Sequence, residues 1–214
     1  KKILFLGAAP TQMPPLRYAR EQGHHVITCD YLPENPGHAL ANESYNVSTT
    51  DKEVILDLAQ RLKIDAIIAY ASDPAAPTAA HVAEQMGLAG NPYQAVLTLA
   101  RKDLFRAFLK EHGFNVPRSQ SFYDREQARA WLTEIGVPAY IKPVDSSGSK
   151  GGTRLADPAQ FDEAFEHALT KKREKMVVVE AQIVRARYQV AGDGFVVGGQ
   201  LVFRCWADEH FDKL

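Results

Sequence analysis

Short apolar segments alternate with amphipathic segments through the first 95 residues, and this alternation restricts the possible folds more than any other feature. Continuous apolar runs such as Ile3–Leu6 and Ala66–Tyr70 are typical of buried parallel strands. Between them, Lys52–Leu62 carries apolar side chains at helical spacing, after a capping Thr50 or Asp51. Such strand–helix–strand units build parallel sheets with right-handed connections. We therefore predict a doubly wound parallel α/β domain over residues 1–95.

The remaining elements of this domain follow from the same patterns. The predicted strands are His25–Cys29 and Tyr45–Val47, and the predicted helices are Pro14–Gln22 and Thr78–Met86.

After residue 95 the pattern changes to short helices that lead into a mostly antiparallel sheet. The predicted helices are Tyr93–Leu99, Asp103–Glu111, Arg125–Ile135 and Pro158–Ala168. The predicted strands are Ala139–Lys142, Thr153–Leu155, Met176–Glu180, Tyr188–Ala191, Gly194–Val197 and Gln200–Arg204. Gly198-Gly199 is expected to join the last two strands as a hairpin, and Val116-Pro117 to lie in an extended segment. Residues 96–214 are therefore predicted to form a separate α+β lobe.

A glycine- and serine-rich loop follows the strand that ends at Lys142-Pro143. The stretch Tyr140–Gly152 reads Y-I-K-P-V-D-S-S-G-S-K-G-G. Its glycines tolerate positive φ, so backbone N–H groups can surround phosphate oxygens, and two lysines add positive charge. The spacing differs from the P-loop, because no Ser or Thr follows Lys150. A mobile hairpin tip is the alternative interpretation of this loop.

Composition argues against several classes of protein. A formal net charge of −1 gives no reason to expect a nucleic acid or an anionic membrane as partner. No apolar run approaches the roughly 18 residues of a membrane span. The two cysteines, Cys29 and Cys205, are far apart in sequence, which fits a reducing cytoplasm and argues against a disulfide scaffold. No histidine pairing suggests zinc, and we predict no metal ligands within the chain.

The order of motifs along the chain resembles the ATP-grasp superfamily. Arg101-Lys102-Asp103 opens a helix, Lys142-Pro143 precedes the S-S-G-S-K-G-G loop, and V-V-V-E occupies Val177–Glu180. The likeness covers nearly all of the chain. It is strongest to the branch of carbamoyl-phosphate-synthase large chains, biotin carboxylases and purine-biosynthesis ligases. The resemblance implies an N-terminal pre-ATP-grasp domain followed by the first part of an ATP-grasp domain.

The resemblance also implies a function and a set of binding residues. Such enzymes use ATP and Mg²⁺ to phosphorylate a carboxylate, which an amine or similar nucleophile then attacks. Lys102 and Lys142 resemble the two cations that contact the nucleotide. Glu180 resembles the hinge residue, and Ile183 resembles a residue lining the adenine slot. The mobile flap over the phosphates corresponds to Ser146, Ser147, Gly148, Ser149, Lys150, Gly151 and Gly152. The implied partners are small-molecule carboxylates and amines, with a homodimer as one candidate assembly, and no residue is assigned a catalytic role.

The chain departs from the family pattern in two ways. In the family the hinge glutamate usually begins the pattern E-x-x-x-x-G-x-E, whereas after Glu180 of this chain Arg185 replaces the glycine and Arg187 the second acid. Arginine offers only donors and cannot bind Mg²⁺. The family's Mg²⁺ ligands would lie beyond Leu214, so we expect the chain to be a fragment that does not turn over ATP. A nucleotide-binding module without catalysis is the second hypothesis.

A dinucleotide-dependent oxidoreductase is the third hypothesis. Gly7-Ala8-Ala9-Pro10 follows the first strand, and Asp30 follows the second at a place suited to a ribose hydroxyl. The fingerprint is incomplete, because Pro10 and Gln12 stand where glycines belong. Gly7–Thr11 and Ser72-Asp73-Pro74 are both expected at carboxyl ends of strands, where open α/β sheets bind ligands.

Overall fold

The structure describes residues 1–148, 150–170, 174–184 and 186–210. In this computed structural model the chain divides into two units, Lys1–Ala181 and Gln182–Leu214, which are described in turn. The predicted domain boundary after residue 95 lies inside the first unit and stays a prediction.

The first unit begins with a four-stranded parallel sheet in the order β3-β2-β1-β4. The strands are β1 (Lys2–Leu6), β2 (His25–Asp30), β3 (Glu43–Asn46) and β4 (Ala66–Ile68). The helical elements are η1 (Pro10–Gln12), α1 (Met13–Glu21), η2 (Pro36–Leu40), α2 (Lys52–Leu62) and α3 (Ala76–Gln85). The helix α2 has the predicted bounds, and its cap is Asp51, whose carboxylate accepts a hydrogen bond from Val54 N at 3.3 Å.

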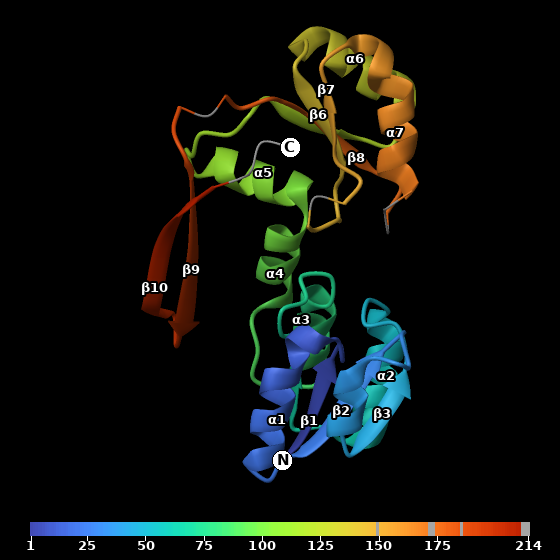
Figure 1. Cartoon of the computed structure of the whole chain (residues 1–214), viewed down its shortest axis with the longest axis vertical. Coiled ribbons are helices and arrows are strands. Elements are labelled where there is room, and N and C mark those ends of the chain that lie inside the picture. The colour runs from blue at the N-terminus through green and yellow to red at the C-terminus, as the bar shows by residue number, and fades with distance from the viewer. Residues whose placement is uncertain (149, 171–173, 185, 211–214) are drawn as a thin grey trace. The chain divides into compact units, whose positions relative to one another are not determined.

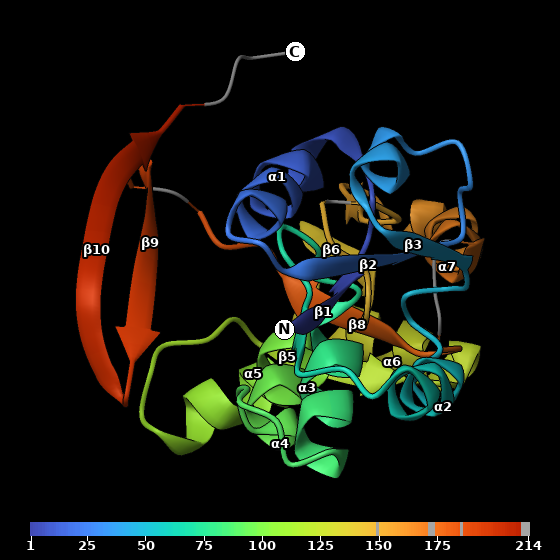
Figure 2. The same cartoon turned by 90° about the horizontal axis from the view of Figure 1, so that it is seen from below.

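Helices cover both faces of this sheet, because side chains alternate along each strand. Leu4 and Leu6 of β1 pack in a core cluster that includes α2 and α3 residues. Ile3 and Phe5 pack on the other face against Leu16 of α1. Figure 2 shows α1 on one side of the strands and α2 and α3 on the other, and Figure 1 shows β1, β2 and β3 side by side. The predicted doubly wound α/β domain is confirmed.

The chain then continues through two short helices into an antiparallel sheet in the order β5-β8-β6-β7. The helices are α4 (Tyr93–Ala100), α5 (Lys102–Glu111), α6 (Arg125–Ile135) and α7 (Phe161–Thr170), with η3 (Pro158–Gln160) preceding α7. The strands are β5 (Ser119–Phe122), β6 (Ala139–Pro143), β7 (Thr153–Leu155) and β8 (Val177–Ala181). One face of the sheet joins α6 and α7 in a core around Ile141, Val179 and Phe161. The predicted α+β lobe is confirmed here.

The sequence analysis did not predict the strand β5 and expected only an extended segment near Val116-Pro117. Its sequence, S-Q-S-F, is mostly polar. Half-buried and exposed residues alternate along it, and only Phe122 is buried, at 5% exposed. The segment is a strand because it pairs in antiparallel register with β8 at the edge of the sheet. The helix expected to begin at Pro158 starts instead as the 3₁₀ turn η3, so α7 begins at Phe161.

The second unit contains a two-stranded antiparallel hairpin of β9 (Gln189–Val197) and β10 (Gln200–Glu209). Gly198 and Gly199 both have positive φ, which suits a tight hairpin turn and confirms the predicted connection. The prediction of two short strands, at Tyr188–Ala191 and Gly194–Val197, was wrong, because β9 runs through both segments without a break. A Cβ on Gly192 would lie 2.3 Å from the ring of Trp206, so this glycine makes room for a cross-strand ring.

The strand expected at Gln200–Arg204 was too short, because β10 extends to Glu209. The hairpin also forms a two-stranded sheet of its own, whereas the sequence analysis assigned these strands to one mostly antiparallel sheet. Among the helices of the described residues, none is long and apolar enough to cross a lipid bilayer.

Candidate nucleotide-binding site

The side chain of Lys102 is held at the start of α5 by the chain that leaves β6. Its backbone N–H donates to Val144 O at 2.9 Å, which fixes the helix start against this segment. Its ammonium donates to Pro143 O at 2.9 Å, to Ser146 O at 2.5 Å and to Ser146 Oγ at 3.4 Å. Residues 41 to 44 positions apart in sequence therefore meet at the base of the predicted flap. Here the structure brings Lys102 next to Ser146, the first residue of the predicted flap.

A charge cluster lies on the sheet face opposite the α6–α7 core. Antiparallel register places Tyr140 of β6 opposite Glu180 of β8, and Lys142 lies two residues further along the same face. The Lys142 ammonium lies 2.5 Å from Glu180 Oε1 and 4.8 Å from the centre of the Tyr140 ring. Glu180 itself is only 5% exposed. The predicted nucleotide-contacting lysine and the predicted hinge glutamate are thus direct partners.

Arg106 completes this cluster and was missed by the sequence analysis. Its guanidinium donates to the other carboxylate oxygen, Glu180 Oε2, at 3.3 Å. Arg106 follows Lys102 by four residues, so both side chains lie on one face of α5. This four-residue spacing is the sequence signal that could have identified Arg106 as a member of the site. The buried carboxylate of Glu180 is thereby shared between two cations, as a buried charge requires.

Burial and charge both act on Lys102. Removal from water lowers the pKa of the Lys102 ammonium, and the positive charge of Lys142 acts in the same direction. By contrast, Arg101 is engaged elsewhere: it forms ion pairs of 2.7 Å with Asp103 and with Glu174. Its hydrogen bond to Asp103 is the largest cause that raises the pKa of its guanidinium. Arg101 is thus paired with two carboxylates, whereas the described hydrogen bonds of the Lys102 ammonium are to uncharged oxygens, which favours Lys102 as the cation that neutralises a ligand.

Two glycines of the loop between β6 and β7 adopt positive φ. Gly148 and Gly151 have φ of 63° and 74°, which residues with a Cβ adopt rarely. Gly148, Lys150 and Gly152 are exposed, Ser146 and Ser147 are half-buried, and Gly151 is buried. Asp145 accepts a hydrogen bond from Glu174 N at 2.8 Å and so anchors the base of the loop. Ser149 lies outside the described residues.

Ile183 belongs to the second unit, and its side chain is exposed. Its predicted place in the adenine slot stays a prediction. Arg185 and residues 211–214 lie outside the described residues. Among the described residues, no group of three or more His, Cys, Asp or Glu side chains is placed to hold a metal ion. The Mg²⁺ ligands expected beyond Leu214 therefore also stay a prediction.

The end of β1 shows why a dinucleotide site fits poorly. Asp30 accepts hydrogen bonds from Ala8 N at 2.9 Å, Leu32 N at 3.0 Å and Asn35 Nδ2 at 2.8 Å. The carboxylate expected to bind a ribose thus ties two loops together. A Cβ on Gly7 would lie 2.4 Å from Gln12 Oε1, so the Gln12 side chain fills the space over the turn. A pyrophosphate needs that space for close approach to the backbone.

Taken together, the described site gathers Lys102, Lys142 and Arg106 beside a glycine-rich loop. The buried carboxylate of Glu180 is already paired with Lys142 and Arg106. Lysine ammonium groups and backbone N–H groups of such a loop are the donors that bind phosphate oxygens in proteins. The arrangement is chemically suited to a polyphosphate anion.

Known proteins resemble this chain in sequence and in fold. The family described as "Carbamoyl-phosphate synthase L chain, ATP binding domain" matches residues 101–195. A formate-dependent phosphoribosylglycinamide formyltransferase from Wolinella succinogenes is 27% identical over 191 residues, which cover 88% of this chain and 49% of that protein. The chain thus spans about half the length of the curated relatives it matches.

Two solved structures illustrate the shared fold. N5-carboxyaminoimidazole synthetase from Staphylococcus aureus, complexed with ADP, has a TM-score of 0.66 at 20% identity, with 88% of this chain and 49% of that chain covered. An L-amino acid ligase from Bacillus licheniformis has a TM-score of 0.65 at 21% identity, with 86% and 44% covered. At these identities the likeness establishes the fold alone.

Proposed function

Because this chain belongs to the ATP-grasp superfamily, we propose that its complete protein is an ATP-dependent ligase. The ligase activates a carboxylate as an acyl phosphate for attack by an amine or similar nucleophile. ATP is held by Lys102, Lys142, the loop 146–152 and the segment 180–183. The observation that carries this proposal is that Lys102 binds the base of the loop after β6, while Lys142 of β6 lies close enough to lower the pKa of Lys102. The two lysines are far apart in sequence, and ordinary solvated surface lysines would have no physical reason to lie close together.

The residues of the chain have distinct roles in this proposal. ATP supplies, when bound, the phosphoryl group that activates the carboxylate. Lys102 and Lys142 neutralise phosphate oxygens, and the glycines of the loop let backbone N–H groups approach them. Glu180 holds the Lys142 ammonium in place, and Arg106 keeps that buried carboxylate paired when Lys142 turns toward a phosphate. Catalysis of this kind consists mainly of positioning and charge neutralisation.

The test has a binding arm and a turnover arm. We expect the complete protein to bind MgATP, but not NADH, by isothermal titration calorimetry. Lys142→Ala should weaken MgATP binding at least tenfold. The control Lys110→Ala removes a lysine near the end of α5 and should leave MgATP binding unchanged. Unchanged MgATP affinity in Lys142→Ala would refute the assigned phosphate role. Product analysis with carboxylate and amine mixtures then separates a ligase from a binding module. The binding module is considered because Arg187 stands where the family has an acidic residue.

A further inference from the structure

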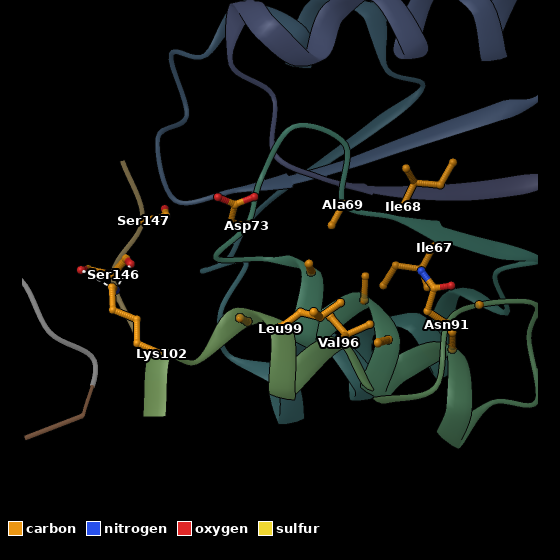
Figure 3. Close-up of a pocket in the computed structure, with 16 residues that line it drawn as sticks. Ile67, Ile68, Ala69, Asp73, Asn91, Val96, Leu99, Lys102, Ser146 and Ser147 are labelled. Atoms are coloured by element: carbon orange, nitrogen blue, oxygen red, sulfur yellow. Dashed lines mark hydrogen bonds between the residues drawn. The ribbon is translucent and has the colours of Figure 1, made fainter. Parts of the chain in front are cut away.

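A cavity of about 650 Å³ lies in the first unit beside Lys102. It extends from the carboxyl end of β4 across α3 and α4 to the base of the loop after β6. Figure 3 shows Lys102, Ser146, Ser147 and Asp73 at one end, with Val96, Leu99 and Ile67 further along it. Of the two predicted strand-end segments, only the one that contains Asp73 reaches this cavity.

The walls away from that end are mostly apolar, with the Asn91 amide as the polar side chain near Ile67. Four alanines of α3 recur at helical spacing along one wall: Ala76, Ala79, Ala80 and Ala83. Val96 and Leu99 of α4 line another part of the cavity. The helix α4 has the sequence Y-Q-A-V-L-T-L-A but contains no buried residue, and Leu99 is 66% exposed. Apolar surface of this kind gains free energy when a ligand removes it from water.

The polar end adjoins the residues proposed to bind phosphates. Lys102 and Ser146 both line the cavity and both belong to the hydrogen-bonded base of the loop. A carboxylate lodged at this end would therefore lie beside the phosphoryl group that is to be transferred. Lys102 is the one cationic residue among the described residues that line the cavity. Its ammonium already donates to two backbone carbonyls.

We infer that this cavity binds the carboxylic acid substrate, and that the substrate carries an apolar aliphatic side chain and not a phosphorylated sugar. The inference rests on the proposed function and names the substrate class of the same site. The carboxylate meets Lys102 and the serines, and the aliphatic group lies along Ala80, Val96 and Leu99. A phosphate monoester is a dianion that needs several donors of its own, and away from the Lys102 end the lining side chains offer only the Asn91 amide. The name of the W. succinogenes relative combines formate, an acid without a side chain, with phosphoribosylglycinamide, and the chemistry of this cavity predicts a larger, apolar acid here.

The test is a ligand-observed NMR titration of the protein saturated with MgADP. The probes are 4-methylpentanoate, acetate and glycinamide ribonucleotide. We expect 4-methylpentanoate to bind at least tenfold more tightly than either of the others. Leu99→Glu places a charge on the apolar wall at an exposed position that tolerates it, and should weaken 4-methylpentanoate binding about tenfold. Val54→Glu, on the exposed surface of α2 outside the cavity, should leave binding unchanged.

The outcomes separate this inference from the proposed function. Failure of the unaltered protein to bind MgADP would count against the proposed function. MgADP binding combined with tighter binding of glycinamide ribonucleotide, or with no 4-methylpentanoate binding, would overturn the inference alone. Equal 4-methylpentanoate affinity in Leu99→Glu and the unaltered protein would overturn it as well. Thermal melting of both variants checks that any loss of binding does not come from unfolding.

Discussion

The ion pair between Lys142 and Glu180 should stabilise the first unit by an amount that a double-mutant cycle can measure. Breaking a buried ion pair costs about 3–5 kcal/mol when the remaining charge has no other partner. In this protein Arg106 still pairs with Glu180 after Lys142→Met, and the Lys142 side chain is 27% exposed. We therefore expect Lys142→Met to lower the free energy of unfolding by about 2 kcal/mol.

The other substitutions of the cycle follow from the same geometry. Glu180→Gln leaves two cations that are 27% and 26% exposed and can be solvated, so its cost should be about 1 kcal/mol. The double variant should lose about 2 kcal/mol and not the sum of about 3, because removal of either partner already removes the pair. The expected coupling between the two side chains is thus about 1 kcal/mol.

Urea unfolding followed by tryptophan fluorescence provides the assay. Trp131 is a suitable reporter, because its indole N–H donates to Val179 O at 3.1 Å, next to Glu180 in β8. The chain has two tryptophans, so the cycle is best measured in a Trp206→Phe background. A coupling energy indistinguishable from zero would show that the pair does not act as a unit in solution, and would refute the argument from burial. Arg61→Met, which breaks the exposed pair with Asp57, is the matched control and should cost less than about 0.5 kcal/mol.

Two further predictions concern titration and reactivity. Because burial and Lys142 lower the pKa of Lys102, its ammonium should lose its proton below the ordinary value of 10.5, and MgATP affinity should fall as pH rises through that lowered pKa. Lys102→Arg should remove this alkaline loss in a calorimetric pH series, and an identical profile in both proteins would contradict the assignment. Burial, with a smaller contribution from Asp30, raises the pKa of the Cys29 thiol to about 12. At pH 8 a thiol reagent should therefore modify exposed Cys205 readily and Cys29 only in denaturant, and two fast thiols in the native protein would contradict this burial.

The sequence alone was sufficient wherever the signal is local. Lys52–Leu62 and Arg125–Ile135 have the predicted helical bounds, because apolar periodicity and an aspartate cap act within a few residues. The loop from Ser146 to Gly152 was recognisable for the same reason, since its glycines serve a local backbone geometry. The resemblance added Lys102, Lys142 and Glu180 as candidates but not the contacts among them.

Tertiary structure decided every feature that depends on partners distant in sequence. The polar segment Ser119–Phe122 is a strand only because β8 lies beside it, and Gly192 lies within a strand because Trp206 fills the space that a side chain would take. Asp30 binds loop amides, where its sequence position suggested a ribose. Arg106 joins the site through Glu180, 74 residues away. Hydrophobic periodicity records which face of an element is buried, whereas the pairing of a buried charge depends on which elements meet, and a single sequence carries no direct record of that.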